Sequence, residues 1–429
     1  MTRTGPTSEA SVAQAAVRPW RRWMLDGLVG LALPLLVGLS QAHLWRAAPA
    51  AVYNWAADEM LAGRFGPRLY DDSYALQATL SYNHGQGQDI LSPTPPTLVF
   101  FTAPARWLPD GVLGVLWLGL DIVVPFLAVW LTFRAVSLPS LALAGACTAL
   151  LLLSGPMWEN NLRGQVLHWQ MLLCALALYG LARGRAALTG ASLGSMFLLK
   201  LAGWPVWLIL AQRLRWRALI WIGLSAAALA AVSLPWVRLE TWLFYLTSVL
   251  PRWAQTPIAV VPAYQTVGGF WQHLLRYDAR LNPAPLLNLP WLATALSIVS
   301  TLALLGLTVL GMHRAPLLLV AGAGLILTVL LAPIAEQYHY LTAVPALIVA
   351  AVEWHRQGHR PALGLMLLAS AWLMFWPINY KDPRLAAGWL ALLAYPRLWG
   401  GLLLWGGGLA LARRLPQPAR QWLAARQAV

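Results

Sequence analysis

The sequence is short of charged residues, and of lysine most of all. Charged residues make up 10% of the 429 residues and hydrophobic residues make up 59%, while Lys200 and Lys381 are the only lysines. Several apolar stretches reach or exceed the roughly 20 residues that span a bilayer. The segments between them are mostly short and rich in Arg, Pro and Gly, which leaves no room for a soluble catalytic domain. We predict a polytopic, all-helical membrane protein with one integrated domain over residues 1–429.

Cysteine is almost absent, and so are the usual signatures of metal or nucleotide binding. Cys147 and Cys174 both fall in apolar stretches, where they are expected to pack as small hydrophobic groups, so no disulfide framework is predicted. His84, His168 and His273 are scattered, without zinc-like spacing. There is no Walker-type phosphate loop and no nucleophile elbow. We therefore predict no metal site and no cofactor.

The excess of positive charge lies mainly in short loops beside the apolar stretches. The net charge is +15. Arg clusters in such loops follow the positive-inside rule and mark the cytoplasmic side. The clusters are Arg18 with Arg21 and Arg22, Arg183 with Arg185, Arg213 with Arg215 and Arg217, Arg356 with Arg360, and Arg413 with Arg414. No basic stripe interleaved with aromatic residues appears, so nucleic acid is not an expected partner.

About twelve apolar segments are predicted to span or re-enter the membrane. They lie at 24–45, 111–133, 138–154, 165–182, 187–200, 202–212, 217–235, 287–311, 315–333, 337–352, 361–377 and 388–412. The first has no clear small-residue cleavage site, which favours a retained helix over a signal peptide. This count places both termini in the cytoplasm, as tails over 1–23 and 413–429, and the plasma membrane is the expected location.

Two long polar stretches, 46–110 and 237–286, then form outward loops. The first holds a large share of the 15 acidic residues. Each contains an amphipathic piece, Val52 to Leu61 and Glu240 to Trp253, of the kind that lies in the membrane interface. Such loops on a helical bundle predict a cavity at the membrane surface, suited to a substrate with a lipid tail and a polar head.

Lys200 interrupts the apolar run GASLGSMFLLKLAGWPVWLIL. A charged amine within a membrane segment is unfavourable, so it usually faces a cavity, a partner or an anionic ligand. Gly203 and Pro205 break the run into two pieces too short to span alone as straight helices. Binding of a phosphate is the favoured hypothesis for Lys200. The alternative is that the amine snorkels to the outer interface.

Asp58 and Glu59, in the segment YNWAADEMLAG, are the candidate bases of the first outward loop. Sugar transfer from a phosphate-linked donor needs a carboxylate to deprotonate the acceptor hydroxyl. It also needs cations or donors where charge develops on the leaving phosphate. The alternative is that both residues form the solvated face of an interfacial helix. Asp71 and Asp72, in LYDDSY, fit a helix cap or a turn better.

Two more polar clusters lie at predicted ends of spans. In PMWENNLRGQVLHWQ, Arg163 is placed to clamp a phosphate through two hydrogen bonds, with Gln165 beside it. The alternative is an Arg that anchors the interface among capping amides. In LAPIAEQYHYLTAVPAL, His339 is a candidate to donate to a phosphate or to shuttle a proton. The alternative is a packing histidine at a helix start.

Four stretches, taken in order, carry a resemblance to a known family. They are VYNWAADEMLAGRFGPRLYDD, SPTPPTLVFFTAPARWLP, GQVLHWQMLLCALALYGLARGRAALTGASLGSMFLLK and LAPIAEQYHYLTAVPAL, which together cover most of residues 20–350. They resemble the polyprenyl-phosphate-dependent glycosyltransferases of family 87, which have the GT-C fold. The third stretch is the closest, with Gly164, Gln165, Gly190 and Lys200 in register. The resemblance implies a GT-C type helical bundle, and enzymes of this type often need no metal.

The sequence departs from the family pattern in both outward loops. The family usually has an acidic residue, the presumed base, just before the aromatic-Ala-Ala piece, but residues 48–51 here read Ala-Pro-Ala-Ala. Asp58 lies about two helical turns further on, where it projects toward a similar side. Either Asp58 or Glu59 substitutes, or another loop supplies the base, or the activity is lost. In the second loop, an Asn-x-Ser-like element is altered to Tyr-Gln-Thr at 264–266.

By this resemblance, the chain transfers a hexose or pentose, with mannose favoured, from a polyprenyl-phosphate donor. The acceptor is a lipid-linked or cell-envelope molecule on the outer face, and the expected partners are donor, acceptor and membrane lipids. We predict that Asp58, Glu59 and His339 are the catalytic residues. We predict that Lys200, Arg163 and Gln165 bind the donor phosphate.

Two other functions remain open at this point. Broken helices and an intramembrane lysine are also features of transporters and lipid flippases, although no inverted repeat is visible here. The third possibility is a non-catalytic family member that binds a polyprenyl lipid.

Overall fold

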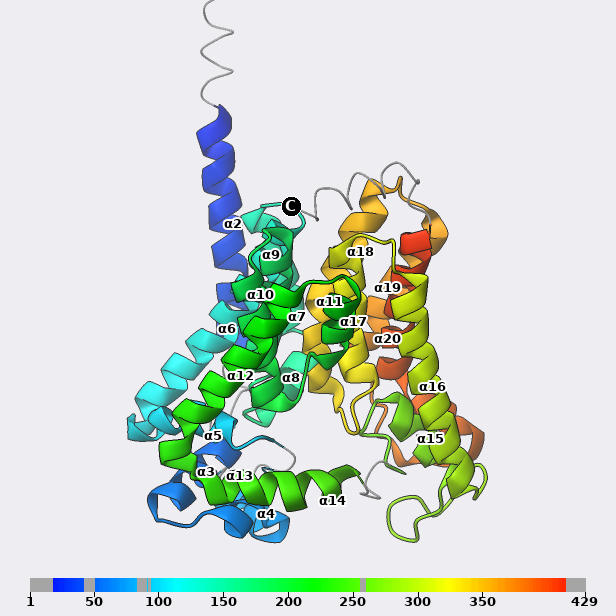
Figure 1. The fold of residues 1–429 in the computed structure, drawn as a ribbon. Coiled ribbons are helices and arrows are strands. Elements are labelled where there is room, and N and C mark those ends of the chain that lie inside the picture. The colour runs from blue at the N-terminus through cyan, green and yellow to red at the C-terminus, as the bar shows by residue number, and fades with distance from the viewer. Residues whose placement is uncertain (1–17, 42–50, 83–90, 92–93, 255–259, 414–429) are drawn as a thin grey trace, which may run out of the picture.

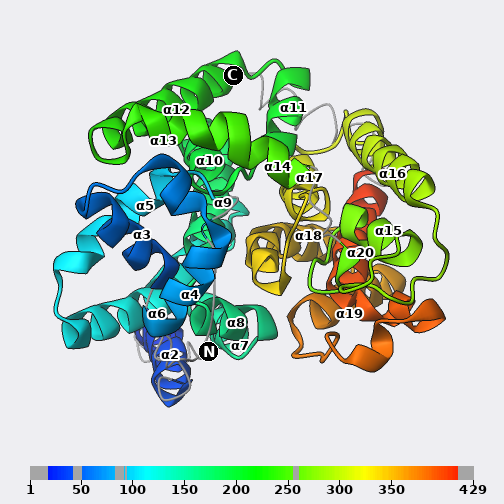
Figure 2. The same cartoon turned by 90° about the horizontal axis from the view of Figure 1, so that it is seen from below.

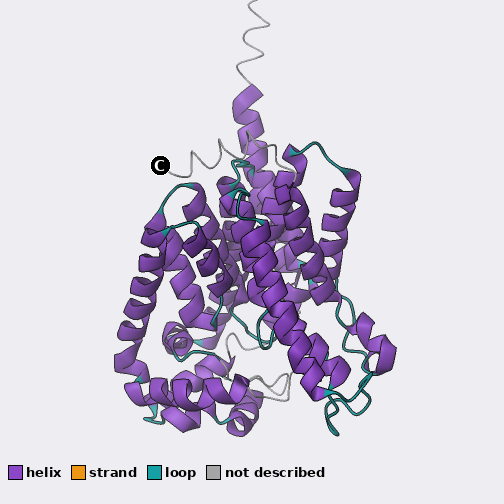
Figure 3. Cartoon of the chain, turned by 45° about the vertical axis from the view of Figure 1, so that its right-hand side comes forward, coloured by secondary structure: helices purple, strands orange, loops and turns teal. Residues whose placement is uncertain are grey.

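A computed structural model describes residues 18–41, 51–82, 91, 94–254 and 260–413. Most of both predicted tails, together with His84 and residues 48–50, lies outside these ranges. The described residues form helices and loops, and their only β-type pairing is an isolated bridge between Asp278 and Asn282 (Figure 3). This confirms the prediction of an all-helical chain.

Each predicted membrane segment contains a helix, and the bounds differ by a few residues in most cases. These helices are α2 (Arg18–Gln41), α6 (Asp110–Ala135), α7 (Leu141–Leu152), α9 (Leu167–Ala182), α10 (Ala186–Lys200), α11 (Trp204–Gln212), α12 (Trp216–Val237), α16 (Pro290–Gly311), α17 (Leu317–Leu330), α18 (Val344–Arg356), α19 (Pro361–Phe375) and α20 (Pro396–Arg413). The segment predicted at 388–412 is divided between a 3₁₀ turn, Gly388–Ala394, and α20.

The prediction of about twelve spans is not confirmed. Within the described ranges, α2, α6, α12 and α16 are long and apolar enough to cross a membrane by themselves. A fifth span is possible if α7 and α8 (Gly155–Leu162), which meet at a bend of 63°, count as one broken helix. Several of the other apolar helices are shorter than the roughly 20 residues that a membrane requires.

The helices form two groups side by side, with a layer of short helices across one end (Figure 1). In one group α10 packs on α12 and α6 on α9, and in the other α19 packs on α20. The short helices at the end are α3 (Ala51–Leu61), α4 (Asp72–Tyr82), α5 (Thr97–Thr102), α13 (Leu239–Phe244) and α14 (Leu250–Ala254). Seen from that end, they cover the first group, while α15 (Val267–Leu275) lies under the second (Figure 2).

The short helices come from both predicted outward loops, and they pack on one another. The backbone N–H of Gly66 donates to Thr241 Oγ1 at 3.1 Å, which joins the first loop to α13. Tyr70 and Trp253 are buried in one hydrophobic cluster that also contacts Leu201, just after α10. The end layer is therefore a packed unit resting on the bundle, and the two amphipathic pieces predicted from the sequence are both helical.

The chain breaks between α10 and α11, as Gly203 and Pro205 predicted. The helix α10 ends at Lys200, and Leu201 follows in a left-handed conformation with a φ of 52°. Gly203, with a φ of 89°, caps the start of α11, and Pro205 stands in its first turn. The break leaves Lys200 in the last turn of α10, where the helix dipole stabilises a cation.

Two glycines allow α10 to lie directly on α12. Gly190 and Gly194 are one helical turn apart, and a Cβ atom at either position would overlap atoms of α12, including backbone oxygens of Ala218 and Ile222. Small residues at this spacing let helix backbones approach closely in membranes. The position of α10, and hence of Lys200, depends on this contact.

We predict that Gly194→Val destabilises the protein by about 1–3 kcal/mol, because the added side chain forces α10 away from α12. The measurement is the midpoint of thermal unfolding in detergent. Gly223→Ala is the matched control, since a Cβ atom at Gly223 meets no atom within 4 Å. Equal midpoints for the two variants would contradict the prediction.

Candidate functional site

A cavity of about 340 Å³ lies beside the break between α10 and α11. Its walls come from this break, the start of α9, the chain from the end of α17 into the 3₁₀ helix Gln337–Ala343, and α14. Of the six residues that the sequence assigned to a site, Lys200, Gln165 and His339 line it. Asp58, Glu59 and Arg163 are not among its lining residues.

Lys200 is half-buried in this wall and is held by two neutral groups. Its Nζ donates to Thr94 Oγ1 at 3.2 Å and to Gln165 Oε1 at 3.1 Å. Neither oxygen carries a charge, so these two bonds orient the ammonium group without cancelling its charge. A cation held in this way is suited to an anionic ligand.

Gln165 reaches Lys200 because of the turn between α8 and α9. Gly164, with a φ of 60°, ends α8, and the side chain of Asn160 accepts a hydrogen bond from the backbone N–H of Leu167 at 3.0 Å. This bond ties the start of α9 to α8. Gln165 is buried in the turn, with 3% of its surface exposed.

His339 presents one ring nitrogen as a potential donor. Its Nδ1 accepts a hydrogen bond from the backbone N–H of Glu336 at 3.1 Å, and the Glu336 side chain accepts one from the backbone N–H of His339. In a neutral imidazole with Nδ1 as acceptor, Nε2 carries the proton. The ring also stacks on Tyr338, with 4.6 Å between centroids. His339 is thus oriented as a hydrogen-bond donor in the cavity wall.

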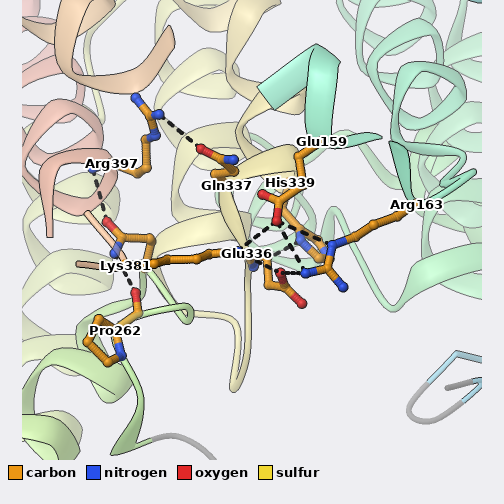
Figure 4. A network of polar contacts seen from close by, with 9 residues as sticks. Glu159, Arg163, Pro262, Glu336, Gln337, His339, Lys381 and Arg397 are labelled. Atoms are coloured by element: carbon orange, nitrogen blue, oxygen red, sulfur yellow. Dashed lines mark hydrogen bonds and ion pairs between the residues drawn. The ribbon is translucent and has the colours of Figure 1, made fainter. Parts of the chain in front are cut away.

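A network of two carboxylates and two cations stands beside the cavity (Figure 4). Arg163 Nε lies 3.2 Å from Glu159 Oε1, and Arg163 Nη2 lies 3.2 Å from Glu336 Oε2. Lys381 Nζ lies 2.7 Å from the same Glu159 oxygen and 3.7 Å from Glu336. The Glu159 side chain is 6% exposed, and buried carboxylates require such partners. Because Glu336 also lines the cavity, the network places Arg163 next to the cavity wall.

The network continues into the second group of helices through a buried arginine. Arg397, at the start of α20, is fully buried, and its Nη2 donates to Gln337 Oε1 at 2.9 Å. Its Nη1 donates to the backbone oxygen of Leu373 at 2.7 Å. These bonds fix the 3₁₀ helix that carries His339 against α19 and α20.

Glu59 lies in an ion-pair cluster of its own within the first loop. Nε and Nη2 of Arg64 donate to its two carboxylate oxygens at 2.6 and 2.8 Å, and the Tyr74 hydroxyl donates at 3.4 Å. The hydrogen bonds and charge of Arg64, with a smaller contribution from Arg68, lower the pKa of Glu59 below its usual 4.5 despite burial. Asp58, the adjacent residue, is half-buried on α3. The geometry favours a structural role for Glu59.

The structure also joins two residues that the sequence left apart. His168 in α9 and Asp121 in α6 are both buried, with His168 Nδ1 3.6 Å from Asp121 Oδ1. Asn160 Nδ2 lies 3.1 Å from the same ring nitrogen. An aspartate within the apolar segment 111–133 was the available signal, but nothing in its spacing pointed to His168.

Comparison with known proteins identifies the family. The model of glycosyltransferase family 87 matches residues 94–333, more than half of the chain. This protein belongs to glycosyltransferase family 87. The family 87 match includes Lys200, Arg163 and Gln165, whereas Asp58, Glu59 and His339 lie outside it. No significant match was found among curated proteins or among solved structures.

Membership of family 87 gives the chain a general function. It is a glycosyltransferase, with a sugar donor and an acceptor as its substrates, and its apolar helices make it a membrane protein. The cavity that holds Lys200 lies mainly between elements within the matched range, and no group of three or more His, Cys, Asp and Glu side chains in the described ranges is arranged to hold a metal ion.

The lowered pKa of Glu59 predicts a pH-dependent stability of this family 87 protein. A carboxylate with a lowered folded pKa stabilises the protein fully above the unfolded value, 4.5, and stops doing so as the pH falls through the folded value. We expect Glu59→Gln to lower the free energy of unfolding by about 1.5–3 kcal/mol at pH 7. The difference from wild type should shrink below pH 4.5.

Denaturant unfolding in detergent across this pH range measures that difference. Glu240→Gln is the control, because Glu240 is an exposed carboxylate on α13, and it should change stability little at neutral pH. A gap between wild type and Glu59→Gln that widens on acidification would contradict the assigned ion pair.

Proposed function

We propose that the chain transfers a sugar from a polyprenyl-phosphate donor to a hydroxyl of a lipid-linked or cell-envelope acceptor, at the outer face of the plasma membrane. The observation that carries this proposal is the cavity in which Lys200, Gln165 and His339 meet at a broken helix. A hexose or pentose fits the proposal, and the family resemblance favours mannose. The Arg clusters in the loops at the opposite ends of the spans support the outward direction.

The donor phosphate is proposed to bind at Lys200. The acceptor hydroxyl attacks the anomeric carbon, the bond from that carbon to the phosphate oxygen breaks, and its electron pair stays on the polyprenyl phosphate. The ammonium of Lys200 and Nε2–H of His339 stabilise the charge that develops there. Arg163 is not in the cavity lining, but its ion pair with Glu336 holds it beside this wall.

The proton of the acceptor hydroxyl is proposed to pass to Asp58. This residue lies on α3, whose Trp55 belongs to the same hydrophobic cluster as Trp253 of the cavity wall. Glu59 is the substitute, although both of its oxygens are bound by Arg64. Among the described residues that line the cavity, Glu336 is the only carboxylate. It is already ion-paired with Arg163, so we assign it to positioning rather than to proton transfer.

A transfer assay with labelled polyprenyl-phosphate sugars and purified protein in detergent tests the function. Turnover with at least one donor, and acceptor-dependent release of polyprenyl phosphate, is the expected result. Tight binding of the lipid without turnover would instead favour a non-catalytic member of the family. Movement of the intact donor across vesicle membranes, again without turnover, would favour a flippase.

In this assay we predict that Lys200→Met lowers kcat/KM by about 100- to 1,000-fold, the usual effect of removing a group that stabilises transition-state charge. Arg217→Met is the matched control, because it removes an exposed positive charge from the first turn of α12. It should keep kcat/KM within about threefold of wild type. A Lys200→Met variant as active as this control would contradict the proposal that Lys200 binds the donor phosphate.

A second pair of variants tests the base. Asp58→Asn should lower kcat by about 100- to 10,000-fold, the range for loss of a general base, while folding remains intact because the change is nearly isosteric. Glu336→Gln should lower kcat/KM much less. A larger loss of activity in Glu336→Gln than in Asp58→Asn would contradict the role of Asp58 as the base. It would assign that role to Glu336 in the cavity wall.

A further inference from the structure

The side chain of Gln170 has an unusual environment. It lies in the first turn of α9, is 1% exposed and lines the cavity. Neither its Oε1 nor its Nε2 has a hydrogen-bond partner among the described residues. Buried amides are nearly always paired, because an unpaired one loses its bonds to water and gains nothing in return. An unpaired amide in the wall of a cavity therefore points to a ligand.

The chemistry of an amide narrows the class of that ligand. Gln170 offers one acceptor oxygen and two N–H donors. A phosphate has acceptor oxygens, so it would satisfy the donors and leave Oε1 unpaired. A hydroxyl group donates and accepts at once, and adjacent hydroxyls of a sugar ring match both ends of an amide.

The rest of the cavity fits a ligand with one anionic end and one uncharged polar end. Lys200 supplies a cation at one wall, while Thr328 and Thr342 add hydroxyl groups from α17 and the 3₁₀ helix. Each of these hydroxyls donates to a backbone oxygen of its own segment, Gly324 for Thr328 and His339 for Thr342. Their lone pairs remain able to accept from a ligand. A cavity of about 340 Å³ is within the range of small-molecule sites.

We propose that Gln170 binds hydroxyl groups of a sugar ring held in this cavity and thereby helps to select which sugar is used. The inference rests on the proposed function and adds a specificity residue that the sequence did not suggest. A site built to bond a hydroxyl discriminates against sugars in which that hydroxyl is missing or inverted, because the amide is then left unpaired.

Ligand binding to the full-length protein in detergent tests this role. The probes are a short synthetic prenyl phosphate and the same lipid carrying a mannosyl group. We expect Gln170→Leu to weaken binding of the mannosylated lipid by about 10- to 100-fold and to leave binding of the prenyl phosphate unchanged. Gln212→Leu, which removes an amide from α11 outside the cavity lining, should alter neither affinity. Lys200→Met should weaken both.

Stability in the absence of ligand separates binding from folding. Because Leu replaces an unpaired buried amide by an apolar group of similar size, Gln170→Leu should unfold at the wild-type temperature or above it. A lower unfolding temperature would show that the amide serves the fold through a buried water, and it would overturn the inference.

A kinetic experiment with octyl mannoside as the acceptor distinguishes the donor sugar from the acceptor sugar as the group that Gln170 binds. A loss confined to the mannosylated lipid assigns Gln170 to the donor sugar, and a raised KM for octyl mannoside alone assigns it to the acceptor sugar. Wild-type behaviour of Gln170→Leu in both arms would overturn the inference while leaving the proposed function standing. If wild type binds neither lipid and transfers nothing, the proposed function fails, and the sugar site fails with it.

Discussion

A charge enclosed in an apolar bundle must find its partners inside the protein, and this requirement organises the centre of the molecule. Lys200 donates hydrogen bonds to two neutral oxygens, from Thr94 and Gln165. Lys381 forms ion pairs with two carboxylates, Glu159 and Glu336. The two lysines of the chain thus differ in these contacts, which are neutral oxygens for Lys200 and carboxylates for Lys381.

Because their contacts differ, the two lysines have different roles. The network around Lys381 links α8, the 3₁₀ helix of His339 and the segment before α20, so it connects the two groups of helices that form the cavity walls. It holds the 3₁₀ helix that carries His339 in place. Under the proposed function, an anion bound at Lys200 lies beside a network whose ion pairs are already formed, which is a preorganised arrangement of the kind that stabilises developing charge.

Local signals in the sequence were sufficient to predict the helices, the break after Lys200 and the family. Gly203 and Pro205 act within their own turn, and apolar stretches define their own helices. The number of spans was not predictable in this way, because helices shorter than a bilayer are supported by neighbours that no local pattern reveals. The same holds for the site. Gln165 and His339 were found beside Lys200, but the pairing of Asp121 with His168 depends on a contact between distant segments. The ion pair of Glu59 with Arg64 depends on the turn after α3, which no pattern in the sequence indicated.

The contact between α10 and α12 fixes more than the packing of two helices. Gly194 seats α10 on its neighbour, and Lys200 follows within the same uninterrupted helix. Each residue of an α-helix turns by about 100° and rises by about 1.5 Å. The number of residues between Gly194 and Lys200 therefore sets both the height and the direction of the ammonium group. Gain or loss of one residue between them would keep both amino acids and still turn the ammonium group away from the cavity. In this stretch, the spacing of the residues matters as much as their identity.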